Sequence, residues 1–504
     1  MKNDRTRNAT LNIAFSLMLQ LVTFARGLIL PRIIIPMYGS DVNGLISSVT
    51  HFLAYISLLE AGVGSVFRAA LYKPLAEENI QRTSGIINEQ KRFYRKIGYI
   101  FFFYVLALMV IYPMIAKTNV DPLYIISLIL ILSVSTFTEY FFSLPYVCLV
   151  SADQKVRINY IVNIVYSVAF IAVSLFWASL KADIRMIYLS MSVIGLLRPL
   201  FYVLYVKKNY RLDSKAKPDE RAMDQRWNGM VHHFAYYIHT NTDTAILTIF
   251  VSTAMVSVYN VYNAVIIGVE QLITSIGNGV AAGIGNLIAT EDRERICQTV
   301  DYFELLQGGM ATVLFTIAAM LLIPFVRVYT VDMKDVNYIQ PMFGYVLILA
   351  EAIYCFRCIY GTVSTSANQF KETQLGAVLE CGTNLLVSLA LVMIAKAGIL
   401  GVAIGTAMAM FVRYVFEVVF LSRNVIFRPV GKAAKMFVGS GVISAVAIFA
   451  CSLLLDYGKI QSMAQWVLYA VGTSVIVVCV AAVGYYLLNR ETMRRLVGRF
   501  IKRG

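Results

Sequence analysis

The chain has 504 residues, of which 59% are hydrophobic and only 14% charged, and its mean hydropathy is +0.69. Soluble domains typically carry about 25% charged residues. Because much of any folded surface in water must be polar, this composition excludes a soluble globular protein. The net charge of +15 lies mostly between the apolar runs and at the ends, where it is expected to orient membrane helices rather than to bind nucleic acid.

Long apolar runs follow one another along the chain, and each membrane-spanning helix needs roughly 20 such residues. We expect about fourteen spans, with no polar stretch long enough for a separate soluble domain. The first run lacks a nearby small-residue cleavage site, so a mature helix is expected rather than a signal peptide. The expected spans are 11–35, 44–68, 97–116, 122–149, 158–180, 184–206, 230–251, 255–289, 306–326, 339–365, 373–395, 398–421, 435–454 and 463–488.

The run 255–289 is too long for one upright crossing. Four glycines interrupt its second half, which predicts one tilted or broken helix followed by a polar end. These glycines are Gly277, Gly279, Gly283 and Gly285.

The distribution of Lys and Arg predicts the orientation. With the N-terminal tail inside and the spans alternating, inside segments hold 31 of the 44 basic residues, outside segments 7 and the spans 6. Because cytoplasmic loops retain Lys and Arg, both termini are expected in the cytoplasm. The most basic loop, within 207–229, follows the sixth span and is expected to be a solvated cytoplasmic linker near anionic headgroups.

The two halves match at a fixed offset of 215 residues, which suggests duplication. Because each copy holds six spans, both enter from the same side as parallel repeats, an architecture that places substrate between the halves in transporters. We therefore expect an N-lobe at 1–206, the linker at 207–229, a C-lobe at 230–421, and two further helices with a basic tail at 422–504. The matches are SADQK at 151–155 with SANQF at 366–370, Lys181-Ala182 with Lys396-Ala397, Arg198 with Arg413, Lys208-Asn209 with Arg423-Asn424, and Gly62 and Gly64 with Gly277 and Gly279.

Six arginines fall within the spans. A charge at the bilayer centre costs about 2.5–3.5 kcal/mol on insertion scales, so each is expected to pair, to snorkel or to face water. They are the candidate residues of a cationic, substrate-binding lumen: Arg26, Arg32, Arg68, Arg198, Arg357 and Arg413.

Position within the span separates some of these arginines. Arg68 lies at the inner end of its span, where snorkelling is expected, and Arg32 lies between Pro31 and Pro36 near the outer end of the first span, where snorkelling and a lumen role stay open. Arg26 lies deeper and favours a lumen role. For Arg198, Arg357 and Arg413 both a lumen role and a structural ion pair stay open.

Acidic residues in the spans offer partners or ion sites. Glu417 follows Arg413 by four residues, so the two can pair on one helix face. Asp243 and Glu60 are candidates for a coupling cation, a coupling proton or an ion pair. The seven are Glu60, Glu139, Asp243, Glu270, Glu351, Glu380 and Glu417.

Residues for enzymatic or metal chemistry are sparse. Cys355 and Cys358 form a CxxC within an expected span, but none of the seven cysteines has zinc-site spacing, and all are interpreted as small core residues. The four histidines, His51, His232, His233 and His239, are interpreted as packing or interfacial residues. The outer loop 327–338 offers only Asp332 and Asp335 as acids. We therefore expect no enzyme, cofactor or metal centre.

Arginine suits an anionic ligand, because its guanidinium stays charged and binds phosphate oxygens bidentately. The segment 31–79 resembles the N-terminal signature of polysaccharide-biosynthesis flippases, the Wzx-like branch of the multidrug/oligosaccharidyl-lipid/polysaccharide (MOP) exporter superfamily. The resemblance rests on Tyr38-Gly39-Ser40, Asn43-Gly44-Leu45 and Leu58-Leu59-Glu60-Ala61-Gly62, and on NTDTAIL at 241–247 with the later Tyr259.

The resemblance implies an all-α, two-lobed MATE/MOP-like bundle of two six-helix repeats plus two C-terminal helices. It implies a multi-pass flippase of the bacterial cytoplasmic membrane that moves an undecaprenyl-pyrophosphate-linked oligosaccharide for O-antigen, lipopolysaccharide, capsule or exopolysaccharide synthesis, beside glycosyltransferases and a polymerase. The open alternatives are an ion-coupled multidrug exporter of the same superfamily, which predicts an acidic lumen, a membrane-embedded enzyme of surface-glycan assembly, and a scaffold without transport.

Overall fold

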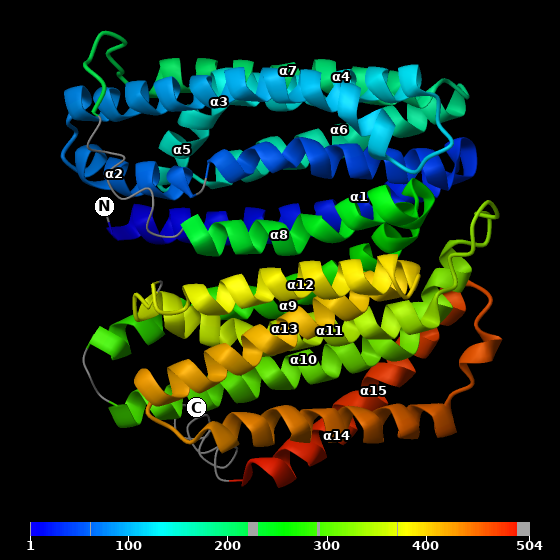
Figure 1. Ribbon diagram of the computed structural model, residues 1–504. Coiled ribbons are helices and arrows are strands. Elements are labelled where there is room, and N and C mark those ends of the chain that lie inside the picture. The colour runs from blue at the N-terminus through cyan, green and yellow to red at the C-terminus, as the bar shows by residue number, and fades with distance from the viewer. Residues whose placement is uncertain (1, 61, 220–229, 290–292, 370, 491–504) are drawn as a thin grey trace. The chain divides into compact units, whose positions relative to one another are not determined.

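A computed structural model describes residues 2–60, 62–219, 230–289, 293–369 and 371–490, and these residues form helices and connecting loops without a strand (Figure 1). Many large apolar side chains face outward: Phe103 is 67% exposed, Leu468 70% and Ile394 83%. Helices with outward apolar faces are stable in lipid rather than in water. Together with the lengths of the helices, this makes the chain a multi-pass membrane protein.

Twelve helical stretches among the described residues are long and apolar enough to cross a membrane. The first of these, Leu11–Leu59, contains a break at Gly39, where two helices meet. Helix α8 (Met230–Ile246) continues through a π-helical turn, η4 (Leu247–Val251), and supplies another crossing. Counted in this way, the long helices of the described residues number fourteen, and the expected fold class is confirmed.

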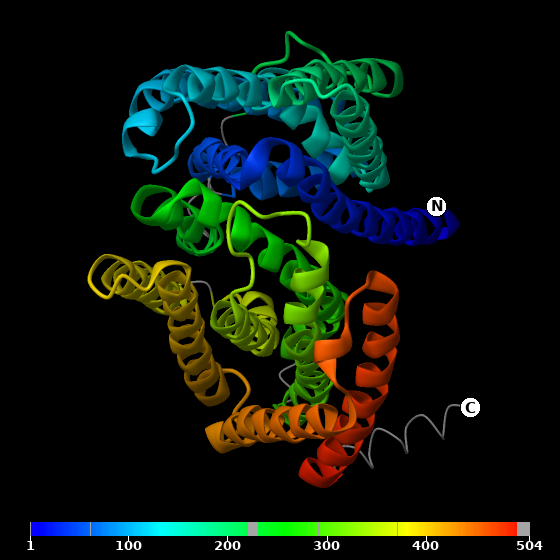
Figure 2. The ribbon, with the colours of Figure 1, turned by 90° about the vertical axis from the view of Figure 1, so that its right-hand side faces the viewer.

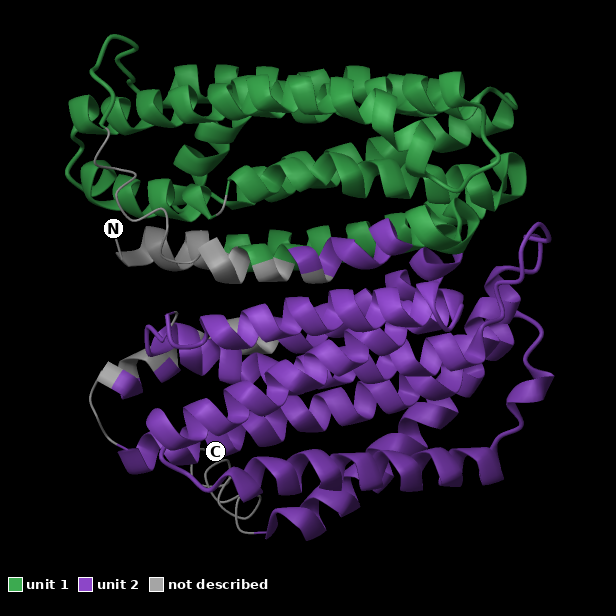
Figure 3. Cartoon of the chain, in the orientation of Figure 1, with its two compact units in different colours: residues 1–237, 247–257 green, residues 238–246, 258–504 purple. Residues whose placement is uncertain are grey.

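Contacts divide the chain into two compact units (Figure 3). Unit 1 comprises residues 1–237 and 247–257, and its core is formed by side chains such as Leu45, Phe101 and Leu128. It contains the first part of α8, η4, the first residues of α9, and the following elements: α1 (Lys2–Ala54), η1 (Tyr55–Leu59), α2 (Val63–Ala76), α3 (Ile80–Ile115), α4 (Pro122–Thr138), η2 (Glu139–Ser143), α5 (Leu144–Ala152), α6 (Arg157–Ser179) and α7 (Ile184–Asn209).

Unit 2 comprises residues 238–246 and 258–504. Helices α10, α14 and α15 pack together around Leu305, Met436 and Tyr485 (Figure 2). The elements of unit 2 are the rest of α8, most of α9 (Thr253–Ala289), α10 (Arg293–Tyr329), α11 (Pro341–Ser366), α12 (Gln374–Met393), α13 (Gly398–Asn424), α14 (Val430–Leu454), η5 (Tyr457–Lys459) and α15 (Met463–Leu488). The lobe boundaries expected from the sequence stay predictions.

Two helices begin far before the apolar run that predicted them. Helix α3 starts at Ile80 rather than at 97, and α10 starts at Arg293 rather than at 306. Lys, Arg, Gln and Glu are good helix formers, so a polar segment continues the helix beyond the lipid. Asn79 caps α3 by accepting a hydrogen bond from the backbone N–H of Arg82 (3.0 Å). Helix α9 runs unbroken from Thr253 to Ala289.

The signature Gly39–Gly44 is explained by backbone geometry inside unit 1. Gly39 has φ 86° and ψ 160°, a conformation that essentially only glycine adopts, and it marks the change of helix direction within α1. At Gly44, a Cβ would lie 1.7 Å from the carbonyl oxygen of Thr253. The neighbouring Asn43 donates to the hydroxyl of Ser257 (2.8 Å). Gly44 and Asn43 therefore allow close contact and a hydrogen bond between α1 and the start of α9.

The duplication is visible in the backbone. Lys181 and Lys396, 215 residues apart, both have left-handed φ, 50° and 52°, just after the ends of α6 and α12. In the SADQ and SANQ turns the left-handed residues are Gln154 and Asn368, so this turn falls one residue out of the sequence register. The two halves thus share the order of their helices and turns more closely than they share the exact 215-residue sequence register.

Candidate functional site

Two half-buried arginines of unit 1 contact one polar and aromatic stripe of α6. Asn163, Tyr166, Ser167 and Phe170 follow the i, i+3, i+4, i+7 spacing of one helix face. From α7, the Arg198 guanidinium donates to the Asn163 side-chain oxygen (2.9 Å) and lies over the Tyr166 ring, 5.0 Å from its centroid. The sequence-predicted Arg198 is therefore held by α6.

Arg26 approaches the same stripe from α1. Its guanidinium donates to the Ser167 hydroxyl (3.3 Å) and lies 5.9 Å from the centroid of the Phe170 ring. No carboxylate of the described residues lies within ion-pair distance of Arg26. A partly buried cation with only a hydroxyl and a ring as partners can still accept an anionic oxygen.

Arg198 differs because it has a carboxylate partner. It donates to Glu139 at 2.5 Å, and the two side chains are 24% and 30% exposed. Glu139 opens the π-helical turn η2 that Pro145 follows, and a proline without an N–H favours such an irregular turn. The next residue, Tyr140, donates its hydroxyl to Glu60 at the broken end of η1. Glu60 is thus hydrogen-bonded within unit 1.

The two remaining arginines of unit 1 lie on helix surfaces. Arg32, on α1, and Arg68, on α2, are both exposed. Arg32 and Arg68 are not part of the α6 stripe, and their assignment to a cationic lumen stays a prediction.

In unit 2 two of the buried arginines, Arg357 and Arg413, share one carboxylate. Arg413 donates to Glu417 at 2.8 Å, the i, i+4 pair that its spacing on α13 predicts, and also to Glu380 of α12. Arg357 of α11 donates to the same Glu417 oxygen, Oε1, at 3.2 Å. The side chains of Arg413 and Glu417 are only 9% and 2% exposed. Burying such a network costs desolvation free energy. Removing one partner nevertheless strongly destabilises the folded protein, because it leaves a buried charge without compensation.

Asp243 lies outside that network, and its hydrogen-bond partners among the described residues are uncharged. It is 2% exposed and accepts hydrogen bonds from Tyr259 (3.1 Å) and from Thr406 (3.0 and 3.2 Å to its two oxygens). Asn384, 1% exposed, donates to Thr406, while its own carbonyl oxygen has no hydrogen-bond partner among the described residues. Carboxylate, hydroxyl and amide oxygens facing one another are suited to a small cation or a proton.

Two further carboxylates of unit 2 are also without a basic partner. Within the described part of the chain, no Lys or Arg lies within ion-pair distance of Glu270 on α9 or Glu351 on α11. Among the described residues, unit 1 therefore has an arginine with no carboxylate within ion-pair distance, and unit 2 has carboxylates with no Lys or Arg within that distance.

Several side chains of these sites were not predicted from the sequence. Asn163 and Ser167 were missed although their spacing on an arginine-facing helix could have indicated them. Asn384 and Thr406 were missed because isolated polar residues in apolar helices give no signal of what they contact. The side chains of His232, His233 and His239 lie outside the described residues. Over the residues that are described, no group of three His, Cys, Asp or Glu is placed to hold a metal ion.

Comparison with known proteins identifies the fold. No family profile and no curated protein matches the chain. The lipid II flippase MurJ, in an inward closed conformation, is similar over 96% of this chain and 100% of its own, with a TM-score of 0.69 and 13% identity. An inward-facing MATE family multidrug resistance transporter of the MOP superfamily is similar over 82% of this chain and 98% of its own (TM-score 0.66, 12% identity). The MATE multidrug transporter DinF-BH matches 83% and 97% (TM-score 0.60, 16% identity). The chain thus has the fold of MOP-superfamily transporters.

Proposed function

We propose that the protein is a flippase that carries a lipid-linked oligosaccharide across the cytoplasmic membrane. The cargo would be an undecaprenyl-pyrophosphate-linked glycan destined for a surface polysaccharide. The observation that carries the proposal is Arg26 of α1, a partly buried cation without a carboxylate partner among the described residues, which contacts the same α6 stripe as Arg198. A pyrophosphate cannot enter hydrocarbon without replacement of its hydration, and guanidinium groups supply that replacement.

The fold supports a lipid-linked cargo. The structurally similar MurJ flips lipid II, and it matches this chain over 96% of its length, whereas the two MATE transporters match 82% and 83%. By this proposal the charged head crosses along arginines of the lumen while the lipid tail stays in the bilayer, and alternating access supplies the route. No bond is made or broken, and both termini lie in the cytoplasm.

Asp243 is the proposed site of a coupling cation or proton. Its shell of Thr406, Tyr259 and Asn384 contains oxygens and no basic group, and the free carbonyl oxygen of Asn384 completes a set of hard ligands. The same acidity favours the second candidate function, an ion-coupled multidrug exporter, because Glu270 and Glu351 would attract cationic compounds. Arg26 of unit 1, by contrast, favours the flippase with its anionic cargo.

The two functions are separated by deletion and by reconstitution. Deletion of the gene should cause lipid-linked glycan to accumulate on the cytoplasmic face, and the purified protein in liposomes should translocate a polyprenyl-pyrophosphate-linked glycan. Unchanged glycan distribution in the deletion strain, together with increased sensitivity to cationic drugs, would instead establish the exporter.

A further inference from the structure

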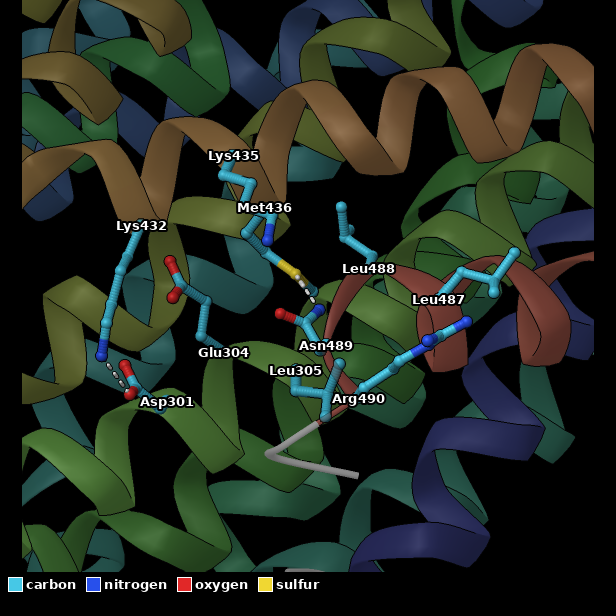
Figure 4. Close-up of a pocket in the computed structure, with 10 residues that line it drawn as sticks. All are labelled: Asp301, Glu304, Leu305, Lys432, Lys435, Met436, Leu487, Leu488, Asn489 and Arg490. Carbon is cyan, nitrogen blue, oxygen red and sulfur yellow. Dashed lines mark hydrogen bonds and ion pairs between the residues drawn. The ribbon is translucent and has the colours of Figure 1, made fainter. Parts of the chain in front are cut away.

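A pocket of about 500 Å³ lies in unit 2 where α10 is still polar, α14 begins and α15 ends (Figure 4). None of its lining residues belongs to the ion-pair network of Arg357 and Arg413 or to the hydrogen-bond partners of Asp243. The apolar stretches of all three helices start just beyond it, so the pocket lies at the level of the lipid headgroups. Both the basic loop before α14 and the basic tail after α15 place this end on the cytoplasmic side.

The acidic groups of the pocket are already neutralised. Asp301 accepts from Arg428 (2.6 Å) and from Lys432 (2.9 Å), the latter contact being drawn in Figure 4. Glu304 accepts from Arg428 (2.8 Å), whose side chain is fully buried beneath the pocket. Two carboxylates thus face two cations, and this ion network forms a floor without net charge.

The rim of the pocket adds two cations. Lys435 comes from the second turn of α14 and Arg490 from the residue pair that follows α15 (Figure 4). Both side chains are exposed, and no carboxylate of the described residues pairs with either. Counted together with the buried Arg428, the pocket therefore has an excess of two positive charges, beside the apolar wall formed by Met436 and Leu487.

We propose that this pocket binds the phosphate headgroup of an anionic phospholipid. Arg490 would contact the phosphate oxygens as a planar fork and Lys435 as a point charge, while Met436 and Leu487 would receive the first carbons of the acyl chains. Basic pockets between membrane helices on the cytoplasmic side bind such headgroups. The bound lipid would hold α14 and α15 against α10, and it is distinct from the cargo of the proposed flippase.

The test is native mass spectrometry of the full-length protein in detergent, titrated separately with phosphatidylglycerol, cardiolipin and phosphatidylethanolamine. The wild type should retain the anionic lipids in preference to phosphatidylethanolamine. The variant Lys435→Ala/Arg490→Ala should bind them roughly tenfold or more weakly, because each basic group near an anionic headgroup contributes on the order of 1 kcal/mol. Lys432 is left intact because it neutralises Asp301.

The matched control is Lys208→Ala/Arg423→Ala, which removes the same charge from the ends of α7 and α13 outside the pocket. It should bind anionic lipid as the wild type does. Equal weakening in the control, or unchanged binding in Lys435→Ala/Arg490→Ala, would overturn the proposal. Competition by inorganic phosphate at the concentration of the lipid would assign the pocket to a free anion and also overturn it. If the double variant unfolds in detergent, the single changes Lys435→Gln and Arg490→Gln serve the same comparison.

Discussion

Arg198 in unit 1 and Arg413 in unit 2 stand at the same place in the repeat, but they have different neighbours. Arg198 contacts an amide, Asn163, on its paired helix α6, whereas Arg413 contacts a carboxylate, Glu380, on the corresponding helix α12. Arg198 forms a partly exposed ion pair with Glu139, whereas Arg413 forms buried ion pairs with Glu380 and Glu417. Duplication therefore preserved the position of the arginine, while the residues around it set its chemistry.

The difference extends to the charge left over in each unit. In unit 1 the described contacts leave Arg26 with no carboxylate within ion-pair distance, and in unit 2 they leave Asp243, Glu270 and Glu351 with no Lys or Arg within that distance. An anionic headgroup and a coupling cation would then be handled by different units. This division of roles is a hypothesis, and the variants below are chosen to break or sharpen it.

The largest loss of folding stability is expected for Glu417→Ala. Its loss leaves the buried Arg357 and Arg413 with one carboxylate between them, and breaking such a buried network typically costs about 3–5 kcal/mol. Thermal unfolding in detergent should show a large fall in melting temperature. Glu139→Ala, which breaks the partly exposed pair of unit 1, should lower it much less. Equal shifts in the two variants would contradict the contrast between the units.

Next is Arg26→Ala, which should reduce glycan translocation in liposomes about tenfold to a hundredfold, because charge-assisted hydrogen bonds contribute about 1.5–3 kcal/mol. The melting temperature should hardly change, since among the described residues Arg26 has only Ser167 as a hydrogen-bond partner. Arg26→Lys keeps the charge and should recover part of the rate. Wild-type translocation by Arg26→Ala would remove this residue from the substrate path.

Asp243→Asn should abolish the dependence of translocation on a cation or proton gradient, with about a tenfold loss of gradient-driven rate, or about 1.4 kcal/mol. The amide retains an oxygen for Thr406 and Tyr259, so folding should be preserved. Rates measured with and without each imposed gradient would show the effect. An unaltered response to every gradient would exclude Asp243 as the coupling site.

The smallest effect is expected for Asn163→Ala, which removes one hydrogen bond from Arg198 while Glu139 still holds it. We expect a loss of about 1 kcal/mol, visible as a slight fall in melting temperature with translocation retained. A fall as large as that of Glu417→Ala would show that the α6 stripe is as tightly constrained as the network of unit 2.

Local patterns in the chain predicted much of this arrangement. Apolar length predicted the crossings, and the four-residue spacing predicted the Arg413–Glu417 pair, because both depend on properties of a single helix. The extended starts of α3 and α10 were missed because helix formation by polar residues continues where the apolar signal ends. The partners of Arg26 and Arg357 were also missed, since Ser167 and Glu417 lie on other helices.

The amino-acid sequence by itself determined that this chain enters a membrane, how many times it crosses and that its two halves are related. These properties depend on the hydropathy and spacing of neighbouring residues along one helix. Only the tertiary structure decided which buried charges are neutralised, because a pair such as Arg413 and Glu380 requires two helices to be packed in one particular register. Among the described residues, helix packing thus placed Arg26 of unit 1 beyond ion-pair distance of a carboxylate, and Asp243, Glu270 and Glu351 of unit 2 beyond ion-pair distance of a basic group.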